Sequence, residues 1–136
     1  MRTTMNKIHP RVGVGEVLFG MSIPDLLNLG YSEDRDDFDE TTRWRAFVRD
    51  AGKVCYVKDE SVICIVCLSD AWLTDENLFD LQTDELERVL GAPDEVGEPV
   101  AVDEERTQIP REYFSLGLQV WIESGKVVSV FCNATY

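Results

Sequence analysis

The residues with the most obvious chemical potential are the cysteines. Cys64 and Cys67 form a C-x-x-C pair, the spacing that holds metal ions or exchanges disulfides in many proteins. Both lie in a strand-like run, where residues three apart point to opposite faces, so their thiolates cannot share one ion. We interpret the motif as accidental. We expect Cys55 and Cys132 to be free thiols as well, and we place Cys67 and Cys132 in the core.

Nucleophilic and acid–base catalysis have few candidate residues. The only histidine, His9, stands beside Pro10 in the N-terminal lead, and no serine has a nucleophile-elbow context. The 26 acidic residues place some carboxylate pair at any chosen separation, so such pairs say nothing about hydrolysis. We therefore predict that the chain is not an enzyme.

Two acidic clusters offer oxygen ligands for calcium. They are Asp36, Asp37 and Asp39, and Asp103, Glu104 and Glu105. Neither has the spacing or the central glycine of an EF-hand loop, and solvated acidic loops are far more common than metal sites. We predict no metal and no cofactor.

The elements that carry these residues come from an internal repeat. Residues 55–67 align without a gap with residues 120–132, and apolar or aromatic residues match at nearly every second position. Upstream of each copy lies a second matching block, 19–30 in the first half and 79–91 in the second. A repeat of this length indicates two copies of one supersecondary unit.

The repeat predicts an α+β fold. We expect a single domain over residues 1–136 with units of about 13–73 and 74–136, each a short helix followed by a three- to four-stranded antiparallel meander. These units join into one sheet or two adjoining sheets.

Capping residues locate the two helices. Ser22 is a suitable N-cap, Pro24 fits the first turn, and Gly30 ends the first helix. Thr83 is the predicted N-cap of a second helix that runs to about Leu90.

Alternation and turn residues locate the strands. They are predicted near residues 43–49, 53–58, 62–68, 111–115, 118–123 and 126–133. Residues 8–18, the acidic run 33–40 and the polar stretch 94–108 are predicted to be loops.

Alternation also separates two faces of the sheet. The face toward the helices is predicted to carry Ile63, Ile65, Cys67, Leu118, Val120, Ile122, Val128, Val130 and Cys132. The opposite face is predicted to carry Arg43, Arg45, Phe47, Arg49, Tyr56, Lys58, Cys64, Val66, Gln119, Trp121, Glu123, Val127, Ser129 and Phe131. Exposed aromatic residues are typical of interface centres, so Tyr56, Trp121 and Phe131 are candidate anchors for a partner. The alternative is that residues 94–108 or a second subunit covers this face.

The net charge of −13, from 13 basic and 26 acidic residues, argues against nucleic acid and anionic membranes as partners and favours a basic protein. A charge that serves only solubility is the alternative. The candidate partner-binding residues are Glu33, Asp34, Asp36, Asp37, Asp39 and Glu40, together with Tyr56, Trp121, Glu123 and Phe131.

The N-terminus and the apolar runs favour the cytoplasm. No run approaches the roughly 20 apolar residues that a membrane helix needs, and the first ten residues do not form a signal peptide. Met5 is an alternative start to Met1.

A family resemblance rests on a short motif. Residues 13–22, Gly-Val-Gly-Glu-Val-Leu-Phe-Gly-Met-Ser, precede the first helix, and the second helix ends in Leu90-Gly91-Ala92-Pro93. This pattern resembles the unit of small bacterial helix-plus-sheet domains, among them the lipoproteins of the outer-membrane β-barrel assembly machinery and, in tandem form, the β-lactamase inhibitor protein. It also resembles cytoplasmic immunity proteins, including those of contact-dependent growth inhibition systems. The missing leader favours the immunity proteins.

These resemblances imply a stoichiometric inhibitor. The expected partner is a basic protein toxin, a nuclease in the main hypothesis, whose active site is occluded by shape and charge. A non-enzymatic adaptor or assembly scaffold of the lipoprotein-like fold and a DNA-mimic inhibitor are the alternatives. We expect a monomer or a weak dimer when the protein is free.

Overall fold

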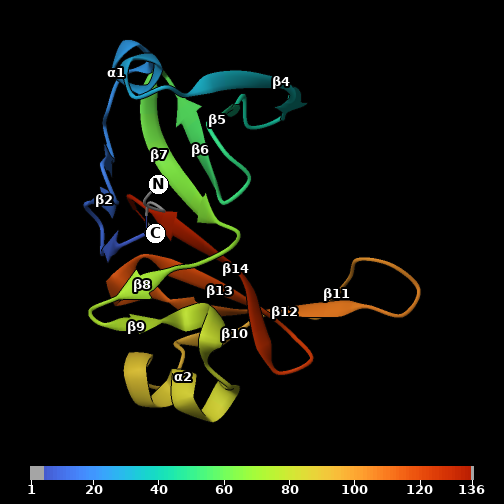
Figure 1. Cartoon of the computed structure of the whole chain (residues 1–136). Coiled ribbons are helices and arrows are strands. Elements are labelled where there is room, and N and C mark those ends of the chain that lie inside the picture. Colours follow the sequence, from blue (N-terminus) through green and yellow to red (C-terminus); the bar gives the residue numbers. More distant parts are fainter. Residues whose placement is uncertain (1–4, 136) are drawn as a thin grey trace.

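A computed structural model describes residues 5–135 of the chain, and nine strands in it form one antiparallel sheet (Figure 1). The choice between Met1 and Met5 as the start concerns residues 1–4, which lie outside the described residues. The strand order is β10 (Glu95–Val96), β12 (Thr107–Tyr113), β13 (Leu118–Glu123), β14 (Lys126–Asn133), β7 (Ser61–Cys67), β6 (Lys53–Lys58), β5 (Arg45–Val48) and β4 (Ser32–Phe38), and β11 (Val100–Ala101) pairs with β12 as well. The α+β class is confirmed, and a single large sheet dominates the fold.

The two helices form where the capping signals predict them. Helix α1 (Ile23–Asn28) begins after Ser22, whose Oγ accepts a hydrogen bond from the Asp25 backbone N–H at 3.3 Å. Helix α2 (Thr83–Leu90) has the expected bounds, but its N-cap is Gln82 and not Thr83. The Gln82 backbone N–H donates to Glu85 Oε1 at 3.0 Å, which satisfies one of the free donors at the helix start.

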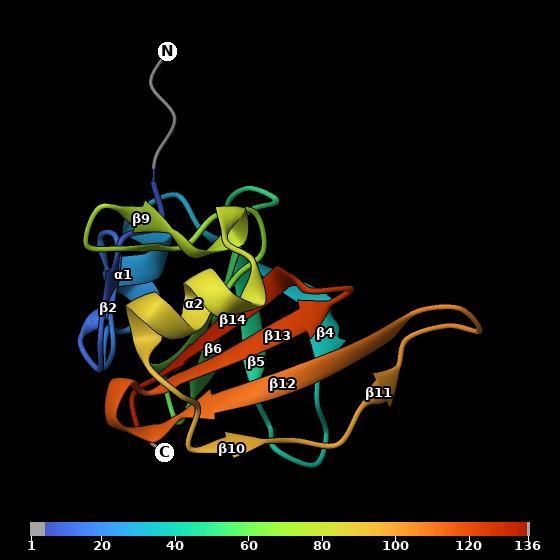
Figure 2. The ribbon, with the colours of Figure 1, turned by 90° about the horizontal axis from the view of Figure 1, so that it is seen from below.

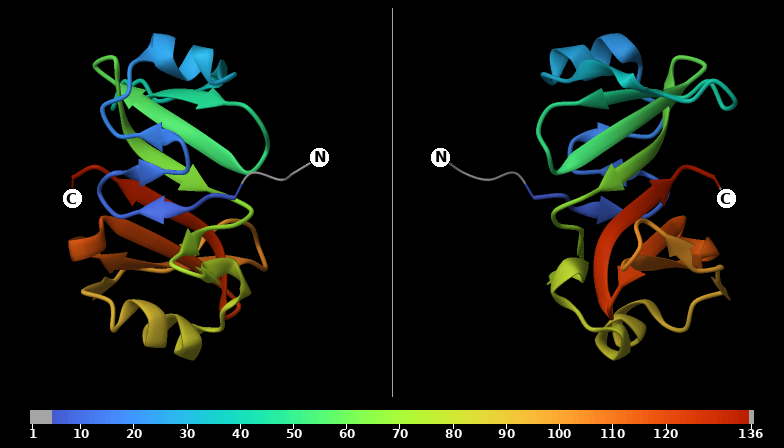
Figure 3. Two further views of the ribbon diagram at one scale, coloured as in Figure 1. Left: turned by 60° about the vertical axis from the view of Figure 1, so that its left-hand side comes forward. Right: turned by 90° about the vertical axis from the view of Figure 1, so that its right-hand side faces the viewer.

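A layer of small elements covers one face of the sheet. From top to bottom, the left panel of Figure 3 shows α1, a three-stranded sheet of β1 (Ile8–His9), β2 (Gly13–Val14) and β3 (Val17–Leu18), and α2. The prediction of a loop over residues 8–18 is therefore wrong. The close pairing of β2 with β3 needs glycine, since a Cβ on Gly13 would lie 2.2 Å from the Val17 carbonyl oxygen. The hairpin β8 (Trp72–Leu73) and β9 (Glu76–Asn77) and the 3-10 turns Leu78–Asp80 and Phe114–Leu116 complete the chain.

The centre of the sheet is the pairing of β7 with β14. Val66 lies opposite Phe131, and Cys67 and Ile65 lie opposite Val130 and Cys132. Val66 and Phe131 are also equivalent positions of the internal repeat. The hairpins β6–β7 and β13–β14 thus meet antiparallel, and the same repeat position is paired with itself at their join.

Both hairpins carry a bulge at the same repeat position. The ladder slips between Tyr56 and Val57 in the first hairpin and between Trp121 and Ile122 in the second. A bulge inserts one residue and reverses the faces beyond it. The predictions that Ile63 and Val128 point to the core are therefore wrong, and Val62 and Val127 take their places with 1% and 5% exposure.

The face assignment of β5 is also corrected. Phe47 lies opposite the buried Cys55 and is 1% exposed, so it belongs to the core and not to the open face. Arg45 shares its face, and it reaches the sheet edge to pair with Glu33. Arg49 likewise pairs with Glu16 among the covering elements, at 2.6 Å. Long arginine side chains can leave a core face at its rim, whereas the ring of Phe47 fills it.

The remaining core assignments are confirmed. Leu26 of α1 and Leu86 of α2 are fully buried against the sheet. Their counterparts in the sheet include the predicted core residues Ile65, Cys67, Leu118, Val120, Ile122, Val130 and Cys132.

Candidate functional site

Two arms project from the sheet on the side away from the helices (Figures 1 and 2). The first arm, residues 34–44, is the outer part of β4 and its turn into β5, and the second arm, residues 98–108, is the β11 hairpin that leads into β12. The sequence predicts loops in both places. The acidic run instead forms the edge strand β4, which pairs with β5 from Ser32↔Val48 to Asp34↔Ala46 and resumes at Phe38↔Arg45.

Edge strands often carry charged side chains, because charge prevents pairing with another chain. The composition of residues 33–40 is therefore compatible with a strand that has one free edge. Both arms are acidic. Residues 34–44 include five acidic and two basic residues, and residues 98–108 include four acidic residues and one basic residue.

The sheet between the arms forms the floor of a groove. The right panel of Figure 3 views this side, with α1 at the top edge and α2 at the bottom edge. The groove has a volume of about 440 Å³. It is lined by Asp37, Val54, Tyr56, Val66, Leu68, Val100, Val102, Gln108, Trp121, Ser129 and Phe131.

Strand register explains why these residues share one face. Phe131 lies opposite Val66, and Val66 lies opposite Val54, so the three side chains form a row across the sheet. Tyr56 and Trp121 flank this row at equivalent repeat positions. The three predicted anchors Tyr56, Trp121 and Phe131 are thus brought together.

The aromatic side chains are held by neighbouring groups. The Trp121 Nε1–H donates to Gln119 Oε1 at 2.7 Å, and the Trp121 and Phe131 ring centroids are 6.3 Å apart. The Tyr56 hydroxyl donates to Asp37 Oδ2 at 2.8 Å. Burial, followed by this contact with a carboxylate, raises the pKa of the Tyr56 phenol, so Tyr56 is a neutral donor at physiological pH.

Apolar surface remains open in the groove. Leu68, Val100 and Val102 are 43–45% exposed, and two of them belong to the second arm. Val66, which also lines the groove, is only 4% exposed. A contiguous apolar patch between polar arms is typical of a protein-binding surface.

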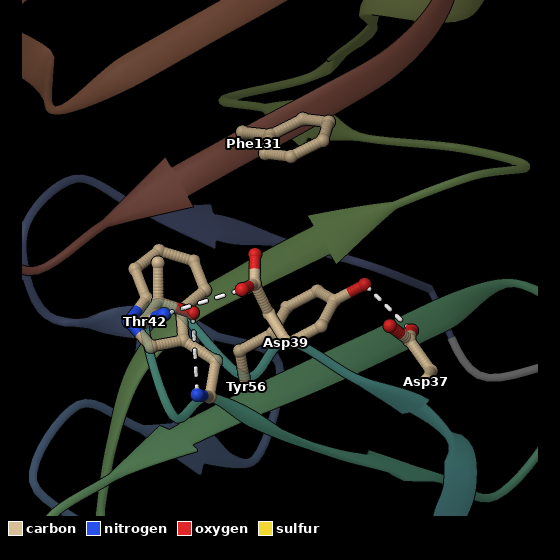
Figure 4. A pocket seen from close by; sticks show the side chains of 6 residues that line it. Asp37, Asp39, Thr42, Tyr56 and Phe131 are labelled. Carbon is tan, nitrogen blue, oxygen red and sulfur yellow. Dashed lines mark hydrogen bonds between the residues drawn. The ribbon is translucent and has the colours of Figure 1, made fainter.

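A smaller pocket of about 240 Å³ adjoins the groove under the first arm (Figure 4). Its lining is Asp37, Asp39, Thr42, Trp44, Tyr56 and Phe131. The Trp44 and Tyr56 rings are 5.7 Å apart at 46°, and Figure 4 shows Asp37 and Asp39 on the same side of the sheet as Tyr56. Asp37, Tyr56 and Phe131 belong to both hollows.

The other predicted carboxylates take different positions. Glu33 lies opposite Phe47, on the helix-bearing face, and makes a two-point ion pair with Arg45 at 2.8 and 2.9 Å. This pairing lowers the pKa of Glu33. Asp34 accepts from the Asp36 backbone N–H at 3.2 Å. Asp36 and Glu40 are exposed, and within residues 5–135 neither forms an ion pair.

Glu123 lies across the groove from the first arm. It accepts two hydrogen bonds from Arg106, each at 3.0 Å, and one from Gln108 at 3.0 Å. These contacts, with Arg106 the largest, lower the pKa of Glu123. Glu123 therefore fixes the base of the second arm to β13, and its charge is already paired.

Several residues of the groove and of the small pocket were not predicted from the sequence. Trp44 stands between two arginines, and Val100 and Val102 lie in an acidic stretch that was predicted to be a loop. The signal available was the spacing of Val100 and Val102, because alternate apolar residues in a polar segment indicate a strand with one apolar face.

The four cysteines are free and buried, as predicted. Cys64 lies opposite Tyr56 on the open face and Cys67 lies in the core, so the C-x-x-C pair is split between faces. Burial raises the pKa of the Cys55 thiol to about 11 and that of Cys64 to about 12.

In the described part of the chain, no group of three or more histidine, cysteine or acidic side chains is arranged to hold a metal ion. Within the same residues, neither helix has the length and apolar character needed to cross a membrane.

Comparisons with known proteins return no match among family models, curated proteins or solved structures. Function is therefore inferred from the groove and from the residues of this chain.

Proposed function

We propose that this chain is a stoichiometric protein inhibitor, an immunity protein that neutralises a basic toxin, with a nuclease as the main hypothesis. The proposal includes a cytoplasmic location, no enzymatic activity, and two tandem helix-plus-meander units that share the large sheet. The observation that carries it is the groove: an apolar and aromatic floor between two arms with unpaired carboxylates.

The groove supports an inhibitor because its two parts suit two tasks. The floor residues Tyr56, Trp121 and Phe131 are of the types that dominate binding energy at interface centres. The acidic arms attract Lys and Arg, the residues that a nuclease uses to hold phosphates. When the groove binds the toxin, its floor thus covers the active site, and the carboxylates of the arms pair with the cationic side chains that bind phosphate.

The tandem-unit description is supported by the strand registers. Both hairpins have a bulge at the same repeat position, and Ser22 of α1 bridges to Ser61 as Gln82 of α2 bridges to Lys126. Ser61 and Lys126 are equivalent residues of the repeat. Each helix therefore meets its own hairpin at the same place.

The test is whether this chain neutralises a toxin encoded by a neighbouring gene. We expect co-expression to restore growth, a 1:1 complex by light scattering, and toxin activity that falls to zero at one equivalent of this chain. A variant with Trp121→Ala and Phe131→Ala should lose protection, whereas Trp72→Ala, on the other face, should keep it. A stable complex that leaves the partner's activity intact would favour the adaptor alternative, and inhibition that depends only on salt would favour a DNA mimic.

A further inference from the structure

The small pocket under the first arm combines aromatic rings with carboxylates. Trp44, Tyr56 and Phe131 supply the rings, and Asp37 and Asp39 supply the negative charge. Aromatic faces attract cations, and an adjacent carboxylate adds a charge-assisted hydrogen bond. Among residues 5–135, no lysine or arginine side chain lines this pocket.

Both carboxylates are positioned by contacts that leave acceptor capacity. Asp37 uses Oδ2 to accept from the Tyr56 hydroxyl. Asp39 uses Oδ1 to accept from the backbone N–H groups of Thr41 and Thr42 at 2.8 and 3.2 Å. Within residues 5–135 neither carboxylate forms an ion pair, so both charges are available to a ligand.

We propose that this pocket binds the guanidinium group of an arginine from a basic protein partner, stacked on Trp44 and Tyr56 and hydrogen-bonded to Asp37 and Asp39. Arginine fits better than lysine, because a planar guanidinium stacks on rings and its fork of donors can reach two carboxylates at once. A volume of about 240 Å³ takes one such side chain, and the adjoining groove of about 440 Å³ takes an apolar neighbour.

This arginine is the residue that a partner inserts, and only the identity of the protein that carries it rests on the proposed function. The pocket itself is tested with a small probe. We would titrate acetyl-arginine N-methylamide into the isotope-labelled chain and follow the indole N–H signals of its three tryptophans by NMR.

Saturable shifts are expected at Trp44. The Trp72 indole is an internal control, because its N–H donates to Asp70 at 2.9 Å outside the pocket. The neutral isostere acetyl-citrulline N-methylamide should produce no saturable shift. An absent response at Trp44, or an equal response to citrulline, would overturn the proposal.

A charge variant separates the pocket from the overall field. Asp37→Asn with Asp39→Asn keeps the oxygen acceptors for Tyr56 and for the turn while removing both charges. We expect this variant to bind the arginine probe about tenfold more weakly. The matched control, Asp75→Asn with Asp84→Asn, removes two charges elsewhere and should change the affinity by less than about twofold. Equal weakening in both variants would show that net charge, and not this pocket, attracts the probe.

The two proposals can fail separately. A chain that binds the probe at Trp44 and neutralises no toxin retains the arginine pocket and loses the immunity function. A chain that neutralises a toxin with unchanged affinity after Asp37→Asn and Asp39→Asn retains the function and overturns the pocket.

Discussion

Two aromatic residues on opposite faces of the sheet, Phe47 and Trp121, should respond differently to truncation. Phe47 is 1% exposed and packs in the core, so Phe47→Ala should lower the free energy of unfolding by about 3–5 kcal/mol. Trp121→Ala removes the ring contact with Phe131 and the hydrogen bond to Gln119. Those losses amount to about 1–2 kcal/mol of stability. For partner affinity the order is reversed, because removal of an aromatic anchor costs about 2 kcal/mol or more.

The assay pairs urea unfolding with calorimetric binding to the neutralised partner. Unfolding midpoints and slopes give the stability of each variant. Trp72→Ala is the matched control, since it truncates a tryptophan outside the groove and should leave affinity unchanged. If Trp121→Ala destabilises the chain as much as Phe47→Ala does, or leaves binding at the wild-type level, the assignment of the open face as the binding face is refuted.

Three further outcomes are expected. Glu60 has φ 64° in the β6–β7 turn, so Glu60→Gly should stabilise the chain by about 0.5–1 kcal/mol. The reciprocal change Gly125→Glu in the β13–β14 turn, at φ 79°, should destabilise the chain by a similar amount. Equal unfolding midpoints for the two variants would contradict this expectation. Asp36→Asn with Glu40→Gln should slow partner association several-fold at low ionic strength, as measured by stopped flow. The difference from the wild-type rate should vanish in high salt. An unchanged rate at low salt would show that the first arm does not steer the partner into contact. All four cysteines should react with a thiol reagent in urea. In the native chain at pH 8 none should react quickly, because all four are buried and the pKa values of Cys55 and Cys64 are raised. Recovery of only two thiols in urea would reveal a disulfide.

Local signals sufficed for the helices and for the central hairpins. Ser22, Pro24 and Gly30 delimit α1 by their own backbone preferences, which do not depend on distant residues. The bounds of β6, β13 and β14 follow from alternation and from turn residues in the same way. Elements are most reliably predicted where the residues that determine a helix or strand lie within it or directly beside it.

The bulges could not be predicted because they are properties of a strand pair. Alternation alone puts Ile63 and Val128 in the core, and only the slip in the ladder moves Val62 and Val127 there. Phe47 is a related case. Its strand has a plausible apolar set on either face, and pairing with Cys55 decides between them.

The arms could not be predicted because contacts with residues distant in the sequence hold them in a defined conformation. Glu33 is fixed by Arg45, Asp37 by Tyr56, and the second arm by the pairing of Arg106 with Glu123. Residues 33–40 lack the periodicity that would reveal such pairing, and residues 94–108 show it only in the spacing of Val100 and Val102, so both stretches were predicted to be loops. The candidate anchors were predicted, whereas the walls that turn them into a groove were not.

The position of the groove follows from the way the two hairpins meet. Tyr56 and Trp121 occupy one repeat position, and Val66 and Phe131 occupy another that pairs with itself at the β7–β14 join. An antiparallel join places each hairpin's aromatic residue on opposite sides of the central pair, and it directs the two arms to opposite walls of the same floor. Half of the chain supplies one arm and part of the floor, so neither half contains the groove. If the open face binds the partner, binding must therefore need both units together. For a chain cut between Ser69 and Thr74, we expect neither fragment alone to bind the partner. The two fragments together should recover affinity only when they re-form the sheet.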